Sequence, residues 1–158
     1  MNIVNLNNSP EAILQKLERY CSYQDRCTRD VVLKMEGWKV AKSMQEKLLK
    51  QLRSEGFVDD LRFASSFVRG KFSVSKWGRI RIGYELRSRQ LPEVIITEAL
   101  QEIVEEAYLD AIRSLIIKKS GEINPKKTLN KREKIIKFVV GKGFEIDLVL
   151  RMIQEIKI

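Results

Sequence analysis

The sequence predicts an all-α fold: an elongated, curved array of three tandem three-helix modules, about nine helices in all. A similar residue pattern recurs at a spacing of 53 residues, in the segments 33–38, 86–91 and 139–144. Each copy looks like the end of a helix, with apolar residues before the stop and a large apolar residue after it. Pro (3) and Gly (8) are also too scarce for a turn-rich β fold. A fixed period near 50 is typical of repeat architectures, in which one supersecondary unit stacks on the next.

The first module is predicted to span residues 9–56. Ser9 is a good N-cap and Pro10 suits a first helical position, so a helix begins there. Gly37 is expected to end the second helix as a left-handed cap. The three predicted helices cover residues 10–20, 24–36 and 40–55.

The second module is predicted to span residues 57–104, with helices that begin near residues 60, 78 and 92. Asp59 and Asp60 precede the first of them. Paired carboxylates invite a metal or acid–base interpretation, but no third acid lies nearby in sequence. We favour a capping role at the junction between the first two modules, with Asp60 also complementing the helix dipole.

The third module is predicted to span residues 105–158. A helix from about residue 105 breaks at Ser120–Pro125, and the loop that follows runs to about Leu129. Two further helices are expected at 131–142 and 145–155. No segment has a convincing strand pattern.

Composition excludes several kinds of chemistry. The chain has no His and two Cys, six residues apart, so His-dependent nucleophilic catalysis and a zinc site are not expected, and both thiols are expected to be reduced. We expect a non-enzymatic protein without a cofactor. A nuclease built on Asp59, Asp60 and Glu85 is a weak alternative. A polar start without a basic segment, and no apolar run near 18 residues, predict a cytoplasmic protein that does not enter a membrane.

Positive charge gathers in the middle of the chain. The net charge is +9, and residues 62–91 contain eight basic residues against one acid, Glu85. Because one carboxylate cannot neutralise them, most of these cations should face water or an external anion such as nucleic acid. A solvated helix face, partly paired through Arg81, Glu85 and Arg89 at i, i+4 spacing, is about as plausible. The candidate contact residues are Arg69, Lys71, Lys76, Arg79, Arg81, Arg87 and Arg89. Within the same stretch, Trp77 could stack on a base or belong to the core.

Two segments resemble a known family. Residues 56–64, GFVDDLRFA, and 78–87, GRIRIGYELR, are similar in order and spacing to motifs of the RecX family, small regulators of the RecA recombinase. The resemblance covers the chain from about Glu11 to Ile156. Gln90 departs from the pattern, since Gly is usual there.

The resemblance implies tandem three-helix modules that bind in the helical groove of the RecA–single-stranded-DNA filament and limit its growth. It implies the RecA filament and single-stranded DNA as partners, with weak duplex binding besides. The alternative is a stand-alone helix-turn-helix protein that reads duplex DNA. Against it, the helix after Leu91 opens with Glu93 and Val94, which are acidic and apolar rather than base-reading.

Overall fold

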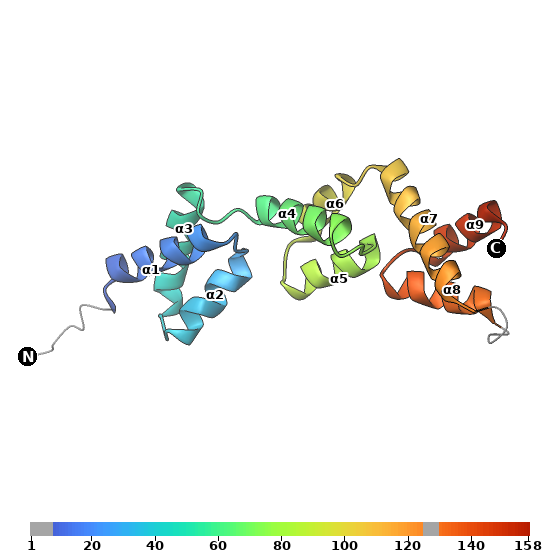
Figure 1. The fold of residues 1–158 in the computed structure, drawn as a ribbon. Coiled ribbons are helices and arrows are strands. Elements are labelled where there is room, and N and C mark those ends of the chain that lie inside the picture. Colours follow the sequence, from blue (N-terminus) through green and yellow to red (C-terminus); the bar gives the residue numbers. More distant parts are fainter. Residues whose placement is uncertain (1–7, 125–129) are drawn as a thin grey trace, which may run out of the picture.

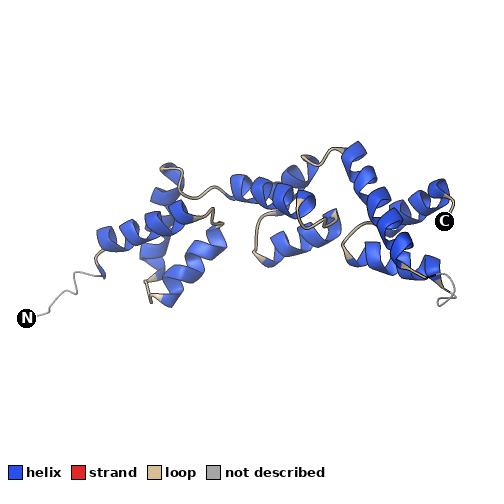
Figure 2. Ribbon diagram, viewed as in Figure 1, coloured by secondary structure: helices blue, strands red, loops and turns tan. Residues whose placement is uncertain are grey.

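The computed structural model describes residues 8–124 and 130–158, which form nine helices and no strand (Figures 1 and 2). The predicted all-α repeat is therefore confirmed. Part of the predicted loop to Leu129 lies outside the described residues. The helices are α1 (Pro10–Tyr23), α2 (Thr28–Gly37), α3 (Lys42–Ser54), α4 (Asp60–Ser73), α5 (Arg79–Ser88), α6 (Glu93–Gln101), α7 (Glu105–Glu122), α8 (Lys131–Gly141) and α9 (Ile146–Ile156).

The helices pack in groups of three along an elongated molecule (Figure 1). Helix α3 contacts α1 and α2; α4, α5 and α6 contact one another, as do α7, α8 and α9. The predicted module limits at residues 56/57 and 104/105 fall in the α3–α4 and α6–α7 connections. We call the three groups the first, second and third modules.

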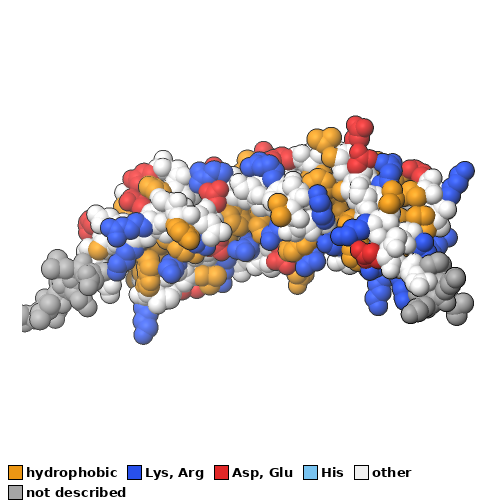
Figure 3. Space-filling model, in the orientation of Figure 1, with side chains coloured by type: hydrophobic (Ala, Val, Ile, Leu, Met, Phe, Trp, Pro, Cys, Tyr) orange, Lys and Arg blue, Asp and Glu red, His pale blue; other side chains and the backbone are white. Residues whose placement is uncertain are grey.

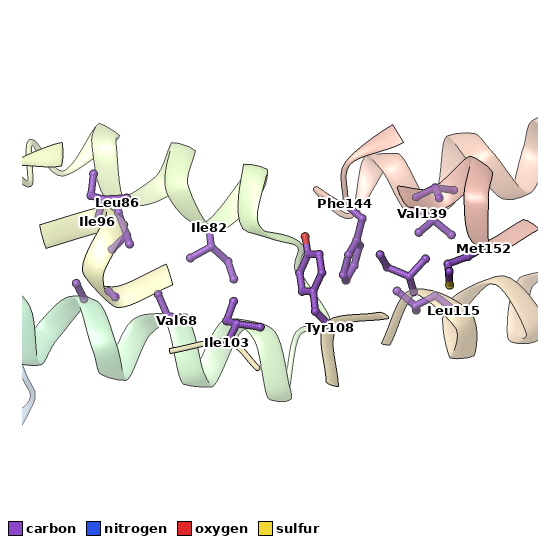
Figure 4. Close-up of a cluster of buried hydrophobic side chains, with 14 of the residues drawn as sticks. Val68, Ile82, Leu86, Ile96, Ile103, Tyr108, Leu115, Val139, Phe144 and Met152 are labelled. Atoms are coloured by element: carbon purple, nitrogen blue, oxygen red, sulfur yellow. The ribbon is translucent and has the colours of Figure 1, made fainter. Parts of the chain in front are cut away.

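The first module has a core of its own, whereas the second and third share one. The first core includes Leu17, Val31, Met35 and Leu52, all fully buried. The second core runs without a break from α4 to α9 and also includes Cys27, just before α2. Tyr108 and Phe144 lie side by side where the second and third modules meet (Figure 4), with ring centroids 5.1 Å apart. The last two modules therefore fold as one apolar unit.

Helical spacing predicts that six side chains of the second module are buried together: Phe63, Phe67, Ile82, Leu86, Leu91 and Leu100. All six belong to this second cluster or pack against it. Phe63, Ile82, Leu86 and Leu91 are buried. Phe67 and Leu100, expected to be buried with them, are partly exposed and pack against the cluster.

The repeat has a spacing of 51 residues between the first two modules and 53 between the last two. The turn after each second helix contains one left-handed residue, at Lys39, Gln90 and Gly143. The predicted left-handed cap at Gly37 is therefore wrong: Gly37 is the last residue of α2, and Lys39 adopts the left-handed conformation. The predicted alignment of the first copy is also wrong by two residues, because its buried position is Met35 while Leu33 is 48% exposed.

Side-chain caps explain where several helices begin. The Ser9 hydroxyl accepts the Ala12 N–H at 3.2 Å, as expected for an N-cap before Pro10. The second helix begins at Thr28 rather than near residue 24, because Asp30 accepts the Cys27 N–H at 3.2 Å and fixes the start there.

Backbone groups join the second module to the third. The Gly78 N–H donates to the Lys142 carbonyl at 2.9 Å, and the Ile80 N–H donates to the Gly143 carbonyl at 3.0 Å. These carbonyls, from the α8–α9 turn, satisfy N–H groups at the start of α5 that have no partner within the helix. Side chains are excluded at this contact, since a Cβ on Gly78 would lie 2.2 Å from the Gly143 oxygen.

We predict that Leu86→Ala lowers the free energy of unfolding by about 2–5 kcal/mol, because it empties a fully buried site. Urea unfolding followed by circular dichroism measures this loss. Tyr84→Ala on the same helix is the control, since Tyr84 is 69% exposed and should change stability by about 0.5 kcal/mol or less. Equal effects of the two changes would contradict the described core.

We also predict that Gly143→Ala destabilises the protein by about 2–5 kcal/mol, from the left-handed backbone and from overpacking. Gly143 has φ +96°, and an added Cβ would lie 2.3 Å from the Arg81 Cβ. Gly141→Ala, two residues away, meets no atom within 4 Å and should be neutral or stabilising. Thermal unfolding of the two variants tests the module contact, and a neutral Gly143→Ala would refute it.

Candidate nucleic-acid interface

Four of the seven predicted contact residues form ion pairs within the protein. The acids lie in α2, α6 and α7 or directly after α6, so the argument that Glu85 is the only available carboxylate is wrong. The pairs are Arg69–Glu102 at 3.0 Å, Arg79–Glu105 at 2.5 Å, Arg87–Glu93 at 2.5 Å and Arg89–Asp30 at 3.0 Å. The hydrogen bond with Arg87 lowers the pKa of Glu93, as expected for a carboxylate that stays ionised beside a guanidinium.

Arg79 belongs to the junction between the second and third modules. Its guanidinium lies 3.9 Å from the Tyr108 ring centroid and also within 3.9 Å of Glu145. The buried Tyr108 hydroxyl accepts the Arg79 N–H at 2.9 Å and donates to Glu145 at 2.5 Å. Burial and this bond to Glu145 raise the pKa of Tyr108. Arg79 therefore orients neighbouring modules, a role that its place in a basic run did not reveal.

The other three predicted residues gather around Trp77. Lys71 Nζ lies 4.7 Å and Arg81 Cζ 4.0 Å from the Trp77 ring centroid. Lys76, next in the chain, is exposed and adopts φ 56°. Across the described residues none of these three cations forms an ion pair, and the predicted ladder of Arg81, Glu85 and Arg89 does not form. We call Lys71, Lys76, Trp77 and Arg81 the middle surface.

Local backbone structure holds the middle surface in place. The Trp77 N–H donates to the Lys71 carbonyl at 3.0 Å, which folds the α4–α5 connection back onto the end of α4. One side of Trp77 packs against the shared core. Lys142 from the third module donates to the Ser75 carbonyl at 3.4 Å and adds another cation beside this connection. The site is thus an aromatic ring packed against the core, with two cations within 5 Å of its centroid.

Asp59 and Asp60 serve helix starts. Asp59 is the N-cap of α4 and accepts the Arg62 N–H at 2.9 Å. The Asp60 carboxylate crosses to the first module, where it accepts the Thr28 N–H at 2.7 Å and the Thr28 hydroxyl at 2.9 Å. These oxygens are already engaged, which disfavours a catalytic role for the pair.

The described residues contain no group of three or more Cys, Asp or Glu side chains that is arranged to hold a metal, so Asp59, Asp60 and Glu85 do not form one. Cys21 and Cys27 are free and buried, and burial raises the pKa of both thiols. None of the described helices is both long and apolar enough to cross a membrane.

Basic side chains also lie outside the middle module. The face drawn in Figure 3 has Lys and Arg side chains along the whole molecule, interspersed with apolar and acidic ones. Fold and surface together define a class of protein: an elongated tandem helical repeat with cations beside aromatic rings on its surface.

Comparisons with known proteins agree with this class. Residues 59–100 match the family model described as the second three-helix domain of RecX. Regulatory protein RecX of Bacillus cytotoxicus is 28% identical over 156 residues, which is 99% of this chain, and that of Leuconostoc mesenteroides is 25% identical over 142 residues, or 90%. These matches confirm the resemblance to the RecX family that the sequence motifs predict. The chain spans 57% and 53% of the length of these two relatives.

Solved structures show the same fold. The crystal structure of RecX from Lactobacillus salivarius superposes with a TM-score of 0.84 at 22% identity, over 94% of this chain and 96% of that one. A second crystal structure of a regulatory protein RecX gives a TM-score of 0.81 at 24% identity, over 90% of this chain and 70% of that one.

The two hydrogen bonds between Asp60 and Thr28 lead to a prediction about the stability of this junction. Asp60→Ala removes both bonds to Thr28 and should cost about 1–3 kcal/mol in urea unfolding. Asp60→Asn keeps an acceptor for the Thr28 N–H and should cost less, with partner binding retained. Asp59→Asn is the control, since Asn is also a good N-cap. Loss of partner binding in Asp60→Asn at an unchanged melting temperature would instead place the carboxylate in contact with the partner.

Proposed function

We propose that this chain regulates the RecA–single-stranded-DNA filament by binding in its groove, without catalysing a reaction. In this proposal it limits filament growth and so lowers strand exchange. The second and third modules act as one rigid unit, and the middle surface faces the DNA phosphates. Other faces of the array contact RecA.

One observation carries the proposal most directly: cations that have no protein carboxylate flank an aromatic ring in a repeat related to RecX. Lys71 and Arg81 lie within 4.7 Å and 4.0 Å of the Trp77 ring centroid. Such a combination suits single-stranded nucleic acid, because cations attract phosphates and an aromatic ring offers a stacking face to a base of any sequence. The elongated form also suits a groove along a filament.

The stand-alone duplex reader has less support. Helix α6 begins at Glu93, whose carboxylate pairs with Arg87. The next residue, Val94, is 72% exposed and apolar. A recognition helix needs donors and acceptors for base edges in its first turns, and these residues supply few of them.

We predict that Lys76→Gln with Arg81→Gln weakens binding to an oligothymidylate by about tenfold at low salt, since each lost phosphate contact costs about 1 kcal/mol or less. Regulation of filaments should fall in parallel. Fluorescence anisotropy measures the affinity over a salt series, and the rate of RecA strand exchange with added protein measures regulation.

The matched control is Arg69→Gln with Arg87→Gln, which removes the same charge from arginines that Glu102 and Glu93 already partner. Its effect on DNA binding should be clearly smaller. Equal losses would show that only net charge matters. Normal regulation by the Lys76/Arg81 variant at all salt concentrations would show that regulation does not need the middle surface. Sustained cleavage of DNA by the protein with Mg²⁺ would refute a purely regulatory role.

A further inference from the structure

The first module contains an alternating ladder of cations and aromatic rings outside the basic middle of the chain. Arg26 Cζ lies 4.1 Å from the Tyr20 ring centroid, and Lys34 Nζ lies 5.1 Å from the same ring. Lys34 Nζ is also 5.6 Å from the Trp38 ring centroid, with Lys16 Nζ at 5.8 Å. We call these five residues, contributed by α1, α2 and the connections beside α2, the first-module ladder.

The ladder positions the positive charges of Arg26 and Lys34 without neutralising them. A carboxylate partner cancels the charge of an arginine, as Glu102 does for Arg69, whereas an aromatic face orients a cation and leaves its full charge for an external anion. Within residues 8–124 and 130–158, neither Arg26 nor Lys34 forms an ion pair, and both lie against rings. Arg26 Nε is buried without a hydrogen-bond partner, so the ring of Tyr20 sets the position of this guanidinium.

The two rings have a rigid support. Tyr20 and Trp38 are partly buried and pack against the first-module core. Each therefore has one side fixed by the core and another that meets lysine or arginine heads. Flexible lysine heads at 5–6 Å are easily displaced by a planar group, because a surface cation–π contact contributes only about 0.5–1 kcal/mol.

A similar arrangement recurs in each module. In the second, Lys71 and Arg81 lie beside Trp77. In the third, Lys119 and Lys142 lie 4.9 Å and 5.9 Å from the Phe138 ring centroid, and Lys119 also pairs with Glu122 at 3.2 Å. The 51- and 53-residue spacings place Trp38 and Lys142 at equivalent positions of their second helices. The three rings themselves do not align by these spacings, so cation–aromatic contacts occur in every module but not at one shared repeat position.

We propose that the first-module ladder is a second binding surface for single-stranded nucleic acid, which takes phosphates on Arg26 and Lys34 and stacks a base on Trp38. The proposal deepens the function above and rests on it, since the same strand would contact the first and second modules. A duplex hides its base faces, and an acidic polypeptide would use the cations but not the rings.

The two tryptophans of the chain, Trp38 and Trp77, allow each surface to be observed alone. In the full chain with Trp77→Phe, an oligothymidylate of about 20 nucleotides should quench Trp38 emission, and salt should weaken the effect. Adding Lys34→Glu should shift the titration midpoint by about tenfold or more, with Lys34→Gln intermediate. Lys50→Glu, the same charge change on an exposed lysine of α3, is the matched control and should shift it far less.

The chain with Trp38→Phe reports on Trp77 and separates the two proposals. Quenching of Trp77 without quenching of Trp38 would overturn the first-module ladder and leave the middle surface intact. Quenching of Trp38 alone would support the first-module ladder and overturn the middle surface as a DNA-binding site. Quenching of neither tryptophan would overturn both proposed sites. Equal quenching of Trp38 by polyglutamate of matched charge would identify an acidic polypeptide as the ligand and also overturn the ladder as a nucleic-acid site. Far-ultraviolet circular dichroism of each variant confirms that it is folded.

Discussion

The backbone contact between Gly78 and Gly143 determines how much of this molecule behaves as one body. The start of α5 always has N–H groups without helical partners, and here the carbonyls of Lys142 and Gly143 accept two of them. Such close approach requires glycine on both sides. Once the α8–α9 turn is docked in this way, Tyr108 and Phe144 are buried between the modules and the two apolar cores merge. The rigid placement of Trp77, one residue before Gly78, follows from the same contact.

The junction between the first and second modules uses the same positions with different chemistry. Thr28 and Arg79 are the first residues of α2 and α5, and each binds the first residue of the helix that opens the next module, Asp60 and Glu105 respectively. At the first junction a carboxylate takes the place of the backbone carbonyls, so the modules are held by side chains. The first core is a separate cluster, and Cys27, just before α2, is the residue of the first module that is buried in the second cluster. We therefore expect the first junction to be the softer of the two, since separate side-chain contacts replace a continuous apolar interface. These contacts join Asp60 to Thr28, Arg62 to Asp25 and Arg89 to Asp30.

Much of the fold follows from the sequence because helices are encoded locally. Caps such as Ser9 and Asp59, glycine stops and the 53-residue echo between Leu86 and Val139 are all visible in the chain. The echo failed in the first module, where Lys39 adopts a left-handed conformation that a search for glycine overlooks. A hydrophobic match two residues away, at Met35, would have revealed the 51-residue spacing. Apolar burial is thus the better guide to register than the stop residue.

The candidate site was harder to predict because ion pairing is a long-range property. Arg89 pairs with Asp30 across 59 residues and Arg69 with Glu102 across 33, so counting acids within a segment overestimates its free charge. What distinguishes the remaining cations is the kind of neighbour that they have. Arginines beside carboxylates stabilise contacts within the second module, as Arg69 does, or between modules, as Arg79 and Arg89 do. Arg81 beside Trp77, and Arg26 and Lys34 beside Tyr20, form no ion pair across the described residues. Arg79 and Arg89 have both a carboxylate and an aromatic ring beside them, so the presence of a carboxylate partner, and not of a ring, distinguishes the structural cations. The cations without such a partner are the ones that the proposed function uses.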